Sequence, residues 1–457
     1  MSGLFLCKAK VVGDRFLLEY CFYSTQRPLF ALNVFSPVNS QGKWLLLTAL
    51  SDIQNMQFIE VNDKGTVSEF LRLPLKIYKN EPNWIRPLDQ DIESVFDKKK
   101  NKFFRHGQCV RWILQDNGQT VGRIGAFFSK KTMNKGNDQP TGGVGFFECL
   151  DNQEYANALF DKAKAWLEDK GLEAMDGPIN FGDRDRFWGL LVDGFDIPPN
   201  YMCNYNPTYY QALFENYGFQ TYFGQLTFGR KTIEPVSEKL HAKAERVHRD
   251  PKYHFEHVKM KNLEKYTEDF LEVYNQAWGG HKGVAKLNIA QARSIMKSMK
   301  PIMDERIVWF GYYGKQPIAF FIMLPEVNQI FRHVGGKLDI IGKLKFVYHK
   351  WRKTCTKMVG MAFGIIPAHQ GKGVEGALVN AAGNLVQKEG FQYEDFEMNW
   401  IGDFNPKMIH VCEQVGGSVV KTHRTYRKLF DESKPFKRHP IINGGKEESD
   451  DNKEEEK

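Results

Sequence analysis

A repeat within the chain is the sequence feature that most constrains its fold. Two apolar segments flank Asp116-Asn117-Gly118, and a second pair of apolar segments flanks Gly314, which lies 196 positions after Gly118. The dipeptide Asn-Pro at 206–207 precedes a helical pattern, and it recurs before another helical pattern at 405–406, 199 positions further on. Two landmarks at nearly the same offset indicate that a whole domain is duplicated.

Local patterns around these landmarks predict both strands and helices. An Asn-Gly pair between two apolar runs favours a tight β-hairpin, and this is the pattern that ends at Gly118. Helical patterns at 154–170 and 375–389 are closed by Gly171 and Gly390, and glycine is a common residue after a helix end. Each half of the chain is therefore predicted to mix strands and helices.

A glycine-rich turn in the second half of the chain predicts an anion-binding site. The apolar run 358–366 predicts a buried strand, Pro367 ends it, and Gln370-Gly371-Lys372-Gly373 follows before a helical pattern that begins at Val374. The first N–H groups of a helix have no partner within the helix, and the helix dipole adds partial positive charge there. Glycine lets the backbone take a positive φ and approach a ligand closely. The turn is thus suited to a phosphate or a pyrophosphate.

The order of strand, glycine-rich loop, helix, strand and Asn-led helix resembles the acetyl-CoA-binding core of the GCN5-related N-acyltransferase (GNAT) superfamily. The resemblance covers most of the chain after Met56; it is specific in the second domain and topological in the first. It implies that the loop holds the CoA pyrophosphate and that the co-substrate is acetyl-CoA or another acyl-CoA. The cofactor-binding residues implied in this way are Phe363, Ile365, Ile366, Gln370, Gly371, Lys372, Gly373, Val374 and Asn405.

The resemblance also implies the fold class, α/β (α+β). Each of two tandem acyltransferase-like domains is expected to be a twisted, mainly antiparallel sheet flanked by helices. We place these domains at 56–230 and 252–430, joined by a polar and partly helical linker at 231–251. In the first domain the segment that corresponds to the phosphate loop, 146–154, has no glycine and carries three carboxylates. This half is therefore predicted to have lost cofactor binding.

Two details of the second-domain loop allow other interpretations. The family has glycine or alanine at the last loop position, where this chain has Glu375, whose carboxylate would repel a pyrophosphate. Residues 371–376 also match the dinucleotide-binding pattern Gly-x-Gly-x-x-Gly, but the chain lacks the further strand–helix repeats of a Rossmann sheet. A turn that binds no ligand is the remaining alternative.

Candidate catalytic groups lie on the strand that follows the phosphate-loop helix. Acyl transfer to an amine requires a polarised thioester carbonyl, a neutral amine and protonation of the leaving thiolate. Strand alternation places Asp395, Glu397 and Asn399 on one side, and we predict Glu397 as the general base. A solvated strand face is the alternative. The family resemblance implies that Cys412 stands where many relatives have a proton-donating tyrosine.

The insertion 331–353 is basic and amphipathic, with lysines and arginine interleaved with large apolar residues. Such a segment can cap a pocket or lie on a membrane surface. We expect a pocket lid, and a peripheral membrane contact is the alternative. A second insertion, 176–205, is rich in Gly, Pro, Asp and aromatic residues and is expected either to line a pocket or to be a well-packed loop.

The two ends of the chain differ from the domains. Residues 1–55 show no sustained period and are predicted to be an N-terminal extension of doubtful order, and Met56, which opens an alternating strand, is an alternative start. The tail 431–457 is predicted to be disordered and acidic, because residues 446–457 hold seven acids and three lysines. The net charge of +8 comes without a nucleic-acid-binding motif, so nucleic acid is not predicted as the main ligand.

The cysteine pattern and the hydropathy of the chain indicate in which cellular compartment the protein resides. The seven cysteines are scattered and no pair has metal-ligand spacing, so reduced thiols are predicted and a metal site is not. No apolar run is long enough to cross a bilayer, and the N-terminus does not resemble a signal peptide. These features predict a cytoplasmic protein and leave its oligomeric state open.

The function predicted from the sequence is acyl-CoA-dependent N-acyl transfer to an amine of a small molecule, bound near the groove between the domains. Two other classes remain: a non-catalytic duplicated acyltransferase fold that binds a small molecule or partner, and a transferase that uses an aminoacyl-tRNA donor. The loop at 370–373 favours CoA over both, because a tRNA-dependent enzyme needs no site for a pyrophosphate. The acyl chain and the acceptor are not revealed.

Overall fold

The computed structural model describes residues 4–12, 15–24, 27–37, 56–277 and 286–442. The chain forms two compact units, one of which comprises Met1–Ile59 with Leu114–Thr120, and the other Glu60–Ile113 with Val121–Lys457. In the first unit, residues that were expected to form an extension contain a three-stranded antiparallel sheet in the order β1-β2-β3. Its strands are β1 (Leu4–Val12), β2 (Arg15–Ser24) and β3 (Arg27–Pro37). The predicted disordered tail lies outside the described residues from 443 onward.

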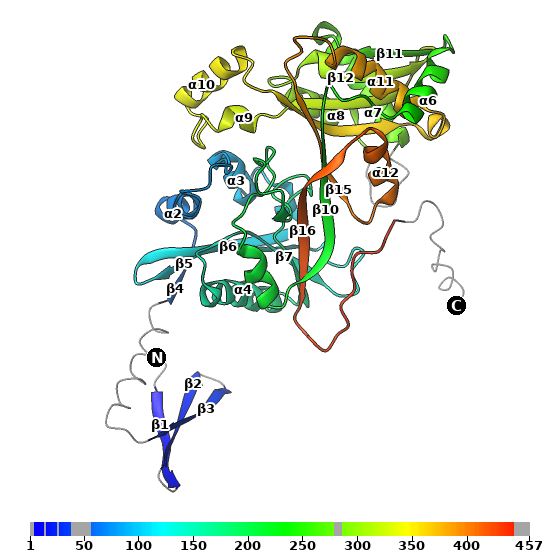
Figure 1. The fold of residues 1–457 in the computed structure, drawn as a ribbon. Helices are drawn as coiled ribbons and strands as arrows, with labels where there is room; N and C mark the ends of the chain where they lie inside the picture. The colour runs from blue at the N-terminus through cyan, green and yellow to red at the C-terminus, as the bar shows by residue number, and fades with distance from the viewer. Residues whose placement is uncertain (1–3, 13–14, 25–26, 38–55, 278–285, 443–457) are drawn as a thin grey trace, which may run out of the picture. The chain divides into compact units, whose positions relative to one another are not determined.

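The remaining strands form one large sheet (Figure 1). Its strand order is β11-β12-β13-β14-β15-β10-β16-β8-β7-β6-β5-β4, and β9 pairs with β16 off this path. The strands of the first domain are β4 (Met56–Glu60), β5 (Gly107–Asp116), β6 (Gln119–Ser129), β7 (Thr141–Cys149), β8 (Ala174–Gly177), β9 (Leu190–Asp193) and β10 (Gln220–Lys231). Those of the second domain are β11 (Tyr253–His257), β12 (Val308–Tyr313), β13 (Gln316–Pro325), β14 (Lys357–Ile365), β15 (Asp395–Gly402) and β16 (Ser418–Leu429).

Helices flank this sheet. They are α2 (Lys64–Ile77), α3 (Asp89–Phe96), α4 (Gln153–Glu168), α5 (Tyr210–Asn216), α6 (Glu238–His248), α7 (Leu263–Ala277), α8 (Ile289–Met299), α9 (Asn328–Phe331), α10 (Ile340–Trp351), α11 (Val374–Val386) and α12 (Pro406–Gln414). Most pairings in the sheet are antiparallel, and β7–β8 and β14–β15 are parallel. This arrangement confirms the predicted α/β fold class and the two tandem acyltransferase-like domains. Each helix in the described ranges is too short or too polar to cross a bilayer.

The two hairpin turns of the repeat are confirmed. The Asn-Pro dipeptide starts a helix directly only in the second domain. Asn117 and Gly118 both have positive φ, 49° and 75°, as a two-residue hairpin turn between β5 and β6 requires. Asn405 caps α12 as expected, with its side chain accepting from the N–H of Met408. Asn206 has a different role, because its side chain pairs with the backbone N–H and C=O of Leu191 in β9, and α5 begins four residues later.

The two domains exchange their last strands, which the sequence did not indicate. β10 lies within the range predicted for the first domain, but it pairs with β15 of the second, from Gln225↔Gly402 to Lys231↔Asp395. β16 pairs in turn with β8 of the first domain, and β10 and β16 pair with each other (Figure 1). Each half of the sheet is thus completed by a strand from the other half. The two acyltransferase-like domains form one continuous hydrogen-bonded structure.

Candidate functional site

The parallel strands β14 and β15 diverge partway along their length. They are paired only from Lys357↔Asp395 to Gly360↔Met398. Beyond this point β14 continues along β13 to the pair Ile365↔Ala319, while β15 continues along β10 to Gly402. One edge of the second half of β14 is therefore left without a strand partner among the described residues, and its backbone N–H and C=O groups can bind an extended ligand.

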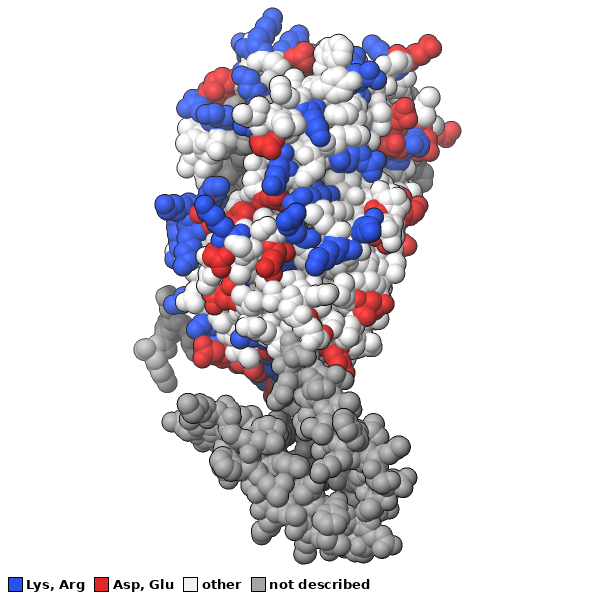
Figure 2. Space-filling view, turned by 90° about the vertical axis from the view of Figure 1, so that its left-hand side faces the viewer, with Lys and Arg blue, Asp and Glu red and all other residues white. Residues whose placement is uncertain are grey.

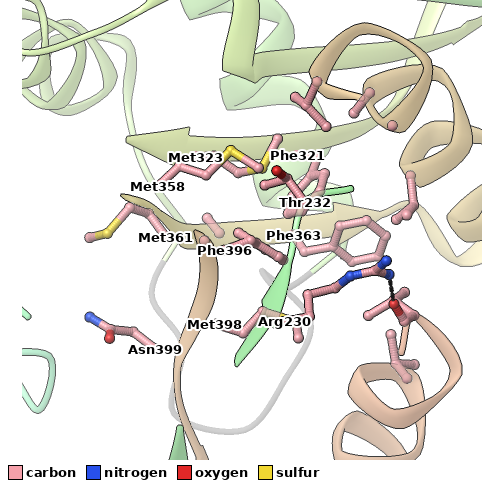
Figure 3. Close-up of a pocket in the computed structure, with 18 of the residues that line it drawn as sticks. Arg230, Thr232, Phe321, Met323, Met358, Met361, Phe363, Phe396, Met398 and Asn399 are labelled. Carbon is pink, nitrogen blue, oxygen red and sulfur yellow. Dashed lines mark hydrogen bonds between the residues drawn. The ribbon is translucent and has the colours of Figure 1, made fainter. Parts of the chain in front are cut away.

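An apolar cavity of about 370 Å³ lies where these strands separate. Phenylalanine and methionine side chains from the strands converge on it (Figure 3): Phe321, Met323, Met358, Phe363, Phe396 and Met398. Helix α11 contributes Val379, Gly383 and Val386, and α12 contributes Met408, Val411 and Val415. A cavity of this size and character is typical of small-molecule and cofactor sites.

The predicted phosphate loop has the backbone geometry that an anion site requires. Gly371 and Gly373 have left-handed φ values of 71° and 91°. Gly373 is the N-cap of α11 and has no side chain to accept from the first N–H groups of the helix. The side-chain amide of Gln370 donates to the carbonyl of Ile365 at 2.8 Å and closes the turn, while Lys372 is exposed. The positive end of α11 thus lacks a side-chain cap, while Gly373 itself is buried against Lys243 of α6.

Glu375 departs from the family pattern, and the structure shows where its carboxylate lies in the helix. It occupies the first turn of α11, one helical turn before Val379, which lines the cavity. Its Oε2 atom is buried without a hydrogen-bond partner among the described residues. An unpartnered carboxylate oxygen on the cavity side of the helix opposes anion binding at this position, as the sequence suggested.

The third glycine of the Gly-x-Gly-x-x-Gly pattern has a packing role. A Cβ on Gly376 would lie 3.1 Å from the carbonyl oxygen of Leu240 in α6, which packs on α11. Ala377 of α11 lies in the same small cluster as Ala244 and Val247 of α6. Close contact between two helices therefore accounts for Gly376, and the dinucleotide interpretation is not needed to explain it. The predicted linker thus supplies the helix that supports the phosphate-loop helix.

The corresponding helix terminus of the first domain is blocked by its own cap. Asn152 precedes α4, and its side chain accepts from the N–H groups of Glu154 at 2.8 Å and Tyr155 at 3.2 Å. Glu148, four residues before it, is partly buried and accepts hydrogen bonds from Tyr78 and Tyr210, both at 2.8 Å. These contacts occupy the donors that an anion would need. The N-terminus of α11 in the second domain has no such side-chain cap, and cofactor binding by either loop stays a prediction.

The other predicted cofactor residues have varied positions. Phe363 lines the apolar cavity. Ile365 and Ile366 are buried in the core of the second domain, and the N–H of Ile366 donates to the carbonyl of Ile318. Val374 is also buried there, and Asn405 is the N-cap of α12 and lies outside the residues that line the cavity. Direct contacts of these residues with a cofactor stay predictions.

Cys412 is part of the core. Its side chain is fully buried in a cluster with Phe228 and Ile401. Burial raises the pKa of its thiol to about 12. The thiol is therefore a packing group in this structure.

Glu397 lies at the centre of a buried ion cluster. One carboxylate oxygen accepts from the ammonium of Lys421 and the amide of Asn200, each at 2.7 Å, and the other accepts from Lys357. Burial by itself would raise the pKa of Glu397, but the charges of Lys421 and Lys357 outweigh it and hold this pKa below its ordinary value. The surroundings favour a permanent negative charge, and the role of Glu397 as general base stays a prediction.

A second, polar cavity of about 510 Å³ lies beside this ion cluster. Residues 196–199, from the insertion at 176–205, contribute to its wall together with Lys357, Glu397 and Glu326 of the second domain. The insertion therefore does line a pocket. Phe396 and Arg230 contribute to both the apolar and the polar cavity. The two cavities are thus built around the same strand, β15.

Sequence reasoning missed Glu326, which directly follows the buried strand β13. Its carboxylate accepts from the backbone N–H groups of Asn328 at 2.8 Å and Tyr201 at 3.0 Å. Burial raises the pKa of Glu326 to about 7, although these hydrogen bonds and the nearby lysines oppose the shift. A carboxyl group of this pKa in a cavity wall can exchange a proton near neutral pH. The only signal in the sequence was a carboxylate at the end of an apolar strand.

Comparisons with known proteins give the following similarities. No family model matches the chain. The chain is 26% identical over 386 residues to a protein named bacterial ceramide synthase from Caulobacter vibrioides, an alignment that covers 82% of this chain and 98% of the relative. It is 24% identical over 403 residues to a protein named YghO from Escherichia coli, with 84% and 98% covered.

Solved structures with similar folds include a tandem GNAT protein and a GCN5-related N-acetyltransferase. One is a tandem GNAT protein from the clavulanic acid biosynthesis pathway, with a TM-score of 0.47, 11% identity, and coverage of 83% of this chain and 100% of that protein. Another is a GCN5-related N-acetyltransferase from Sphaerobacter thermophilus, with a TM-score of 0.44, 9% identity, and coverage of 83% and 97%.

Proposed function

We propose that this chain, whose two tandem domains have the GNAT fold, is an acyl-CoA-dependent N-acyltransferase that joins a long-chain acyl group to the amine of a long-chain amino alcohol. The observation that carries the proposal is the apolar cavity between β14 and β15, flanked by the helix whose N-terminus bears the phosphate loop. The relative named bacterial ceramide synthase supports the choice of acceptor, because a ceramide is a fatty amide of a long-chain amino alcohol.

The proposed position of acyl-CoA follows the length of α11. The pyrophosphate is assigned to Gly371–Gly373, where the loop backbone and the helix dipole favour negative charge and outweigh the opposing Glu375 carboxylate. The pantetheine arm pairs with the unpartnered edge of β14. Gly383 lies ten residues after Gly373, or about 15 Å along the helix, and still lines the cavity. The far end of the cavity is therefore assigned to the acyl chain.

The acceptor amine is proposed to enter from the polar cavity. Glu326, in the wall of this cavity, accepts the proton of the acceptor's ammonium group. The neutral nitrogen then attacks the thioester carbonyl carbon, so that a C–N bond forms, the C–S bond breaks, and the CoA thiolate leaves and takes up a proton. The product is an amide with two long apolar chains.

A product assay tests this function. The purified protein is incubated with acetyl-CoA or a long-chain acyl-CoA and a long-chain amino alcohol, and amide formation is followed by mass spectrometry together with release of free thiol. We expect amide and thiol in equal amounts with the long-chain donor. Lys372→Glu reverses the charge in the exposed loop and should weaken acyl-CoA binding, whereas Lys388→Glu, exposed at the other end of α11, should not. Absence of amide with every donor, despite intact acyl-CoA binding, would contradict the proposal.

The pH dependence of turnover tests the role of Glu326. A base with a pKa of about 7 must be ionised, so turnover should increase as the pH rises through 7. The variant Glu326→Gln should lose this acidic limb and at least about 100-fold in turnover. Turnover also rises with pH as the acceptor's own ammonium group loses its proton. This part of the rise should be the same in wild type and in Glu326→Gln. If Glu326→Gln keeps the limb near pH 7, the base is a different group.

A further inference from the structure

Helix α10, in the basic insertion 331–353, presents a continuous apolar face to solvent. Thirteen large apolar side chains are exposed among the described residues, and six of them lie on this one helix. Their exposed fractions run from 53% to 79%: Ile340, Ile341, Leu344, Val347, Tyr348 and Trp351. The spacing i, i+1, i+4, i+7, i+8 and i+11 places all six on one side of the helix. Apolar side chains gathered in this way mark an interaction surface.

The opposite side of α10 fixes the helix to the protein. Phe346 packs on Phe331 with ring centroids 5.7 Å apart, and His349 stacks on His333 at 4.1 Å. Gly342 is buried, and a Cβ there would lie 2.0 Å from the carbonyl oxygen of Lys337. The close approach holds the helix with its apolar face outward. No residue of 331–353, all of which are described, lines the apolar cavity between β14 and β15, so α10 is not a lid over that cavity. Phe346, Lys350 and Trp351 instead line a separate cavity of about 370 Å³.

Positive charge borders this apolar face. The exposed lysines and arginines of the segment are Arg332, Lys337, Lys343, Lys345, Lys350, Arg352 and Lys353. From Ile340 to Lys353 the sequence contains no acid, and Asp339 is engaged as the N-cap of α10. Figure 2 looks onto the side of the protein that carries this helix and shows lysine and arginine side chains around uncharged surface. Basic residues on both borders of an apolar stripe suit an anionic surface with an apolar interior.

We propose that α10 docks the protein on the surface of an anionic lipid bilayer, with its apolar face in the headgroup–acyl boundary and its lysines on the lipid headgroups. Aliphatic side chains are accompanied by Tyr348 and Trp351, the residue types that favour the membrane–water interface. The helix is too short to span the bilayer, so it lies in the plane of the surface. This inference rests on the helix alone and does not depend on the proposed reaction.

Vesicle co-sedimentation of the full chain tests the proposal. We expect the protein to bind vesicles of phosphatidylcholine with added phosphatidylserine, and to bind pure phosphatidylcholine much more weakly. Leu344→Glu should lower the partition coefficient at least tenfold, about 1.4 kcal/mol, because it places a charge in the centre of the apolar face. Ile233→Glu is the matched control, since Ile233 is 78% exposed outside the helix and should leave binding unchanged.

Two outcomes would overturn the proposal. One is equal binding of wild type and Leu344→Glu to the anionic vesicles. The other is the absence of vesicle binding together with a protein that self-associates, measured by sedimentation velocity, and that Leu344→Glu converts to a monomer. In that case the apolar face joins two copies of the chain. Because Leu344 is 66% exposed, the substitution leaves the core intact, which a melting curve checks.

Discussion

Substitution of Gly383 by leucine is expected to lower kcat/KM for a long-chain acyl-CoA about 50-fold and to leave activity with acetyl-CoA nearly unchanged. Gly383 lines the far end of the apolar cavity, and no atom lies within 4 Å of the position that its Cβ would take. A leucine there would project into the space assigned to the acyl chain. Exclusion of about three methylene groups at roughly 0.8 kcal/mol each gives an effect of this size.

The same substitution should not harm the fold. Gly383 lies within α11, and glycine in a helix interior is less favourable than most residues by up to about 1 kcal/mol. Asn384→Leu is the matched control, because Asn384 is the next residue of the helix and is exposed. The measurement is the ratio of kcat/KM values for the two donors in wild type and in both variants. An unchanged ratio in Gly383→Leu would show that the acyl chain lies elsewhere.

Replacement of Glu397 by glutamine is expected to lower the free energy of unfolding by about 3–5 kcal/mol, because it leaves two buried ammonium groups without their counter-charge. Lys421 and Lys357 have side chains only 3% and 12% exposed, so solvent compensates poorly for the lost carboxylate, least of all at Lys421. Asp395→Asn is the matched control on the same strand. Its partner Lys231 is 57% exposed, and such a surface pair contributes less than about 1 kcal/mol.

The pH dependence of stability gives a second readout for Glu397. Its pKa is held below the ordinary value, so the fold stabilises the ionised carboxylate. This contribution is fully present above the pKa of the unfolded chain and is lost as the pH falls through the folded-state pKa. The difference in unfolding free energy between wild type and Glu397→Gln, measured by denaturant titration, should therefore shrink on acidification. A Glu397→Gln protein as stable as Asp395→Asn would contradict the ion-cluster account.

Glu397 has two candidate roles, as a structural member of the ion cluster and as the general base. Unfolding free energy reports on the first role, and turnover reports on the second. If Glu397 is the general base, a folded Glu397→Gln protein should retain acyl-CoA binding and lose about 100-fold or more in turnover, with loss of the acidic limb of the pH profile. If Glu397 serves only to hold Lys421 and Lys357 in the ion cluster and Glu326 is the base, that limb should persist in Glu397→Gln and disappear in Glu326→Gln. Measurement of both profiles decides between the two carboxylates.

The sequence by itself determined the features that depend on neighbouring residues. Asn117 and Gly118 predicted a hairpin turn because few other residues accept positive φ at both positions. The loop 370–373 predicted an open helix terminus because glycine fixes both the turn and the absence of a side-chain cap. The regular offset between such local signals predicted a duplicated domain, and the family resemblance implied its fold class.

Only the tertiary structure decided which distant groups meet. β10 and β16 follow equivalent patterns, and nothing local specifies that each pairs with the other domain's sheet. Alternation placed Glu397 on a strand face, but its partners Lys421 and Asn200 lie 24 and 197 positions away.

The same limit applies to α10 and to Glu326. The amphipathic pattern of α10 was visible in the sequence, but whether its apolar stripe faced inward or outward depended on the packing of Phe346 and Gly342. The raised pKa of Glu326 likewise comes from burial by segments far apart in the chain. Hydrogen-bond partners, burial and the electrostatic environment are set by contacts across the whole fold, which a local sequence pattern does not contain.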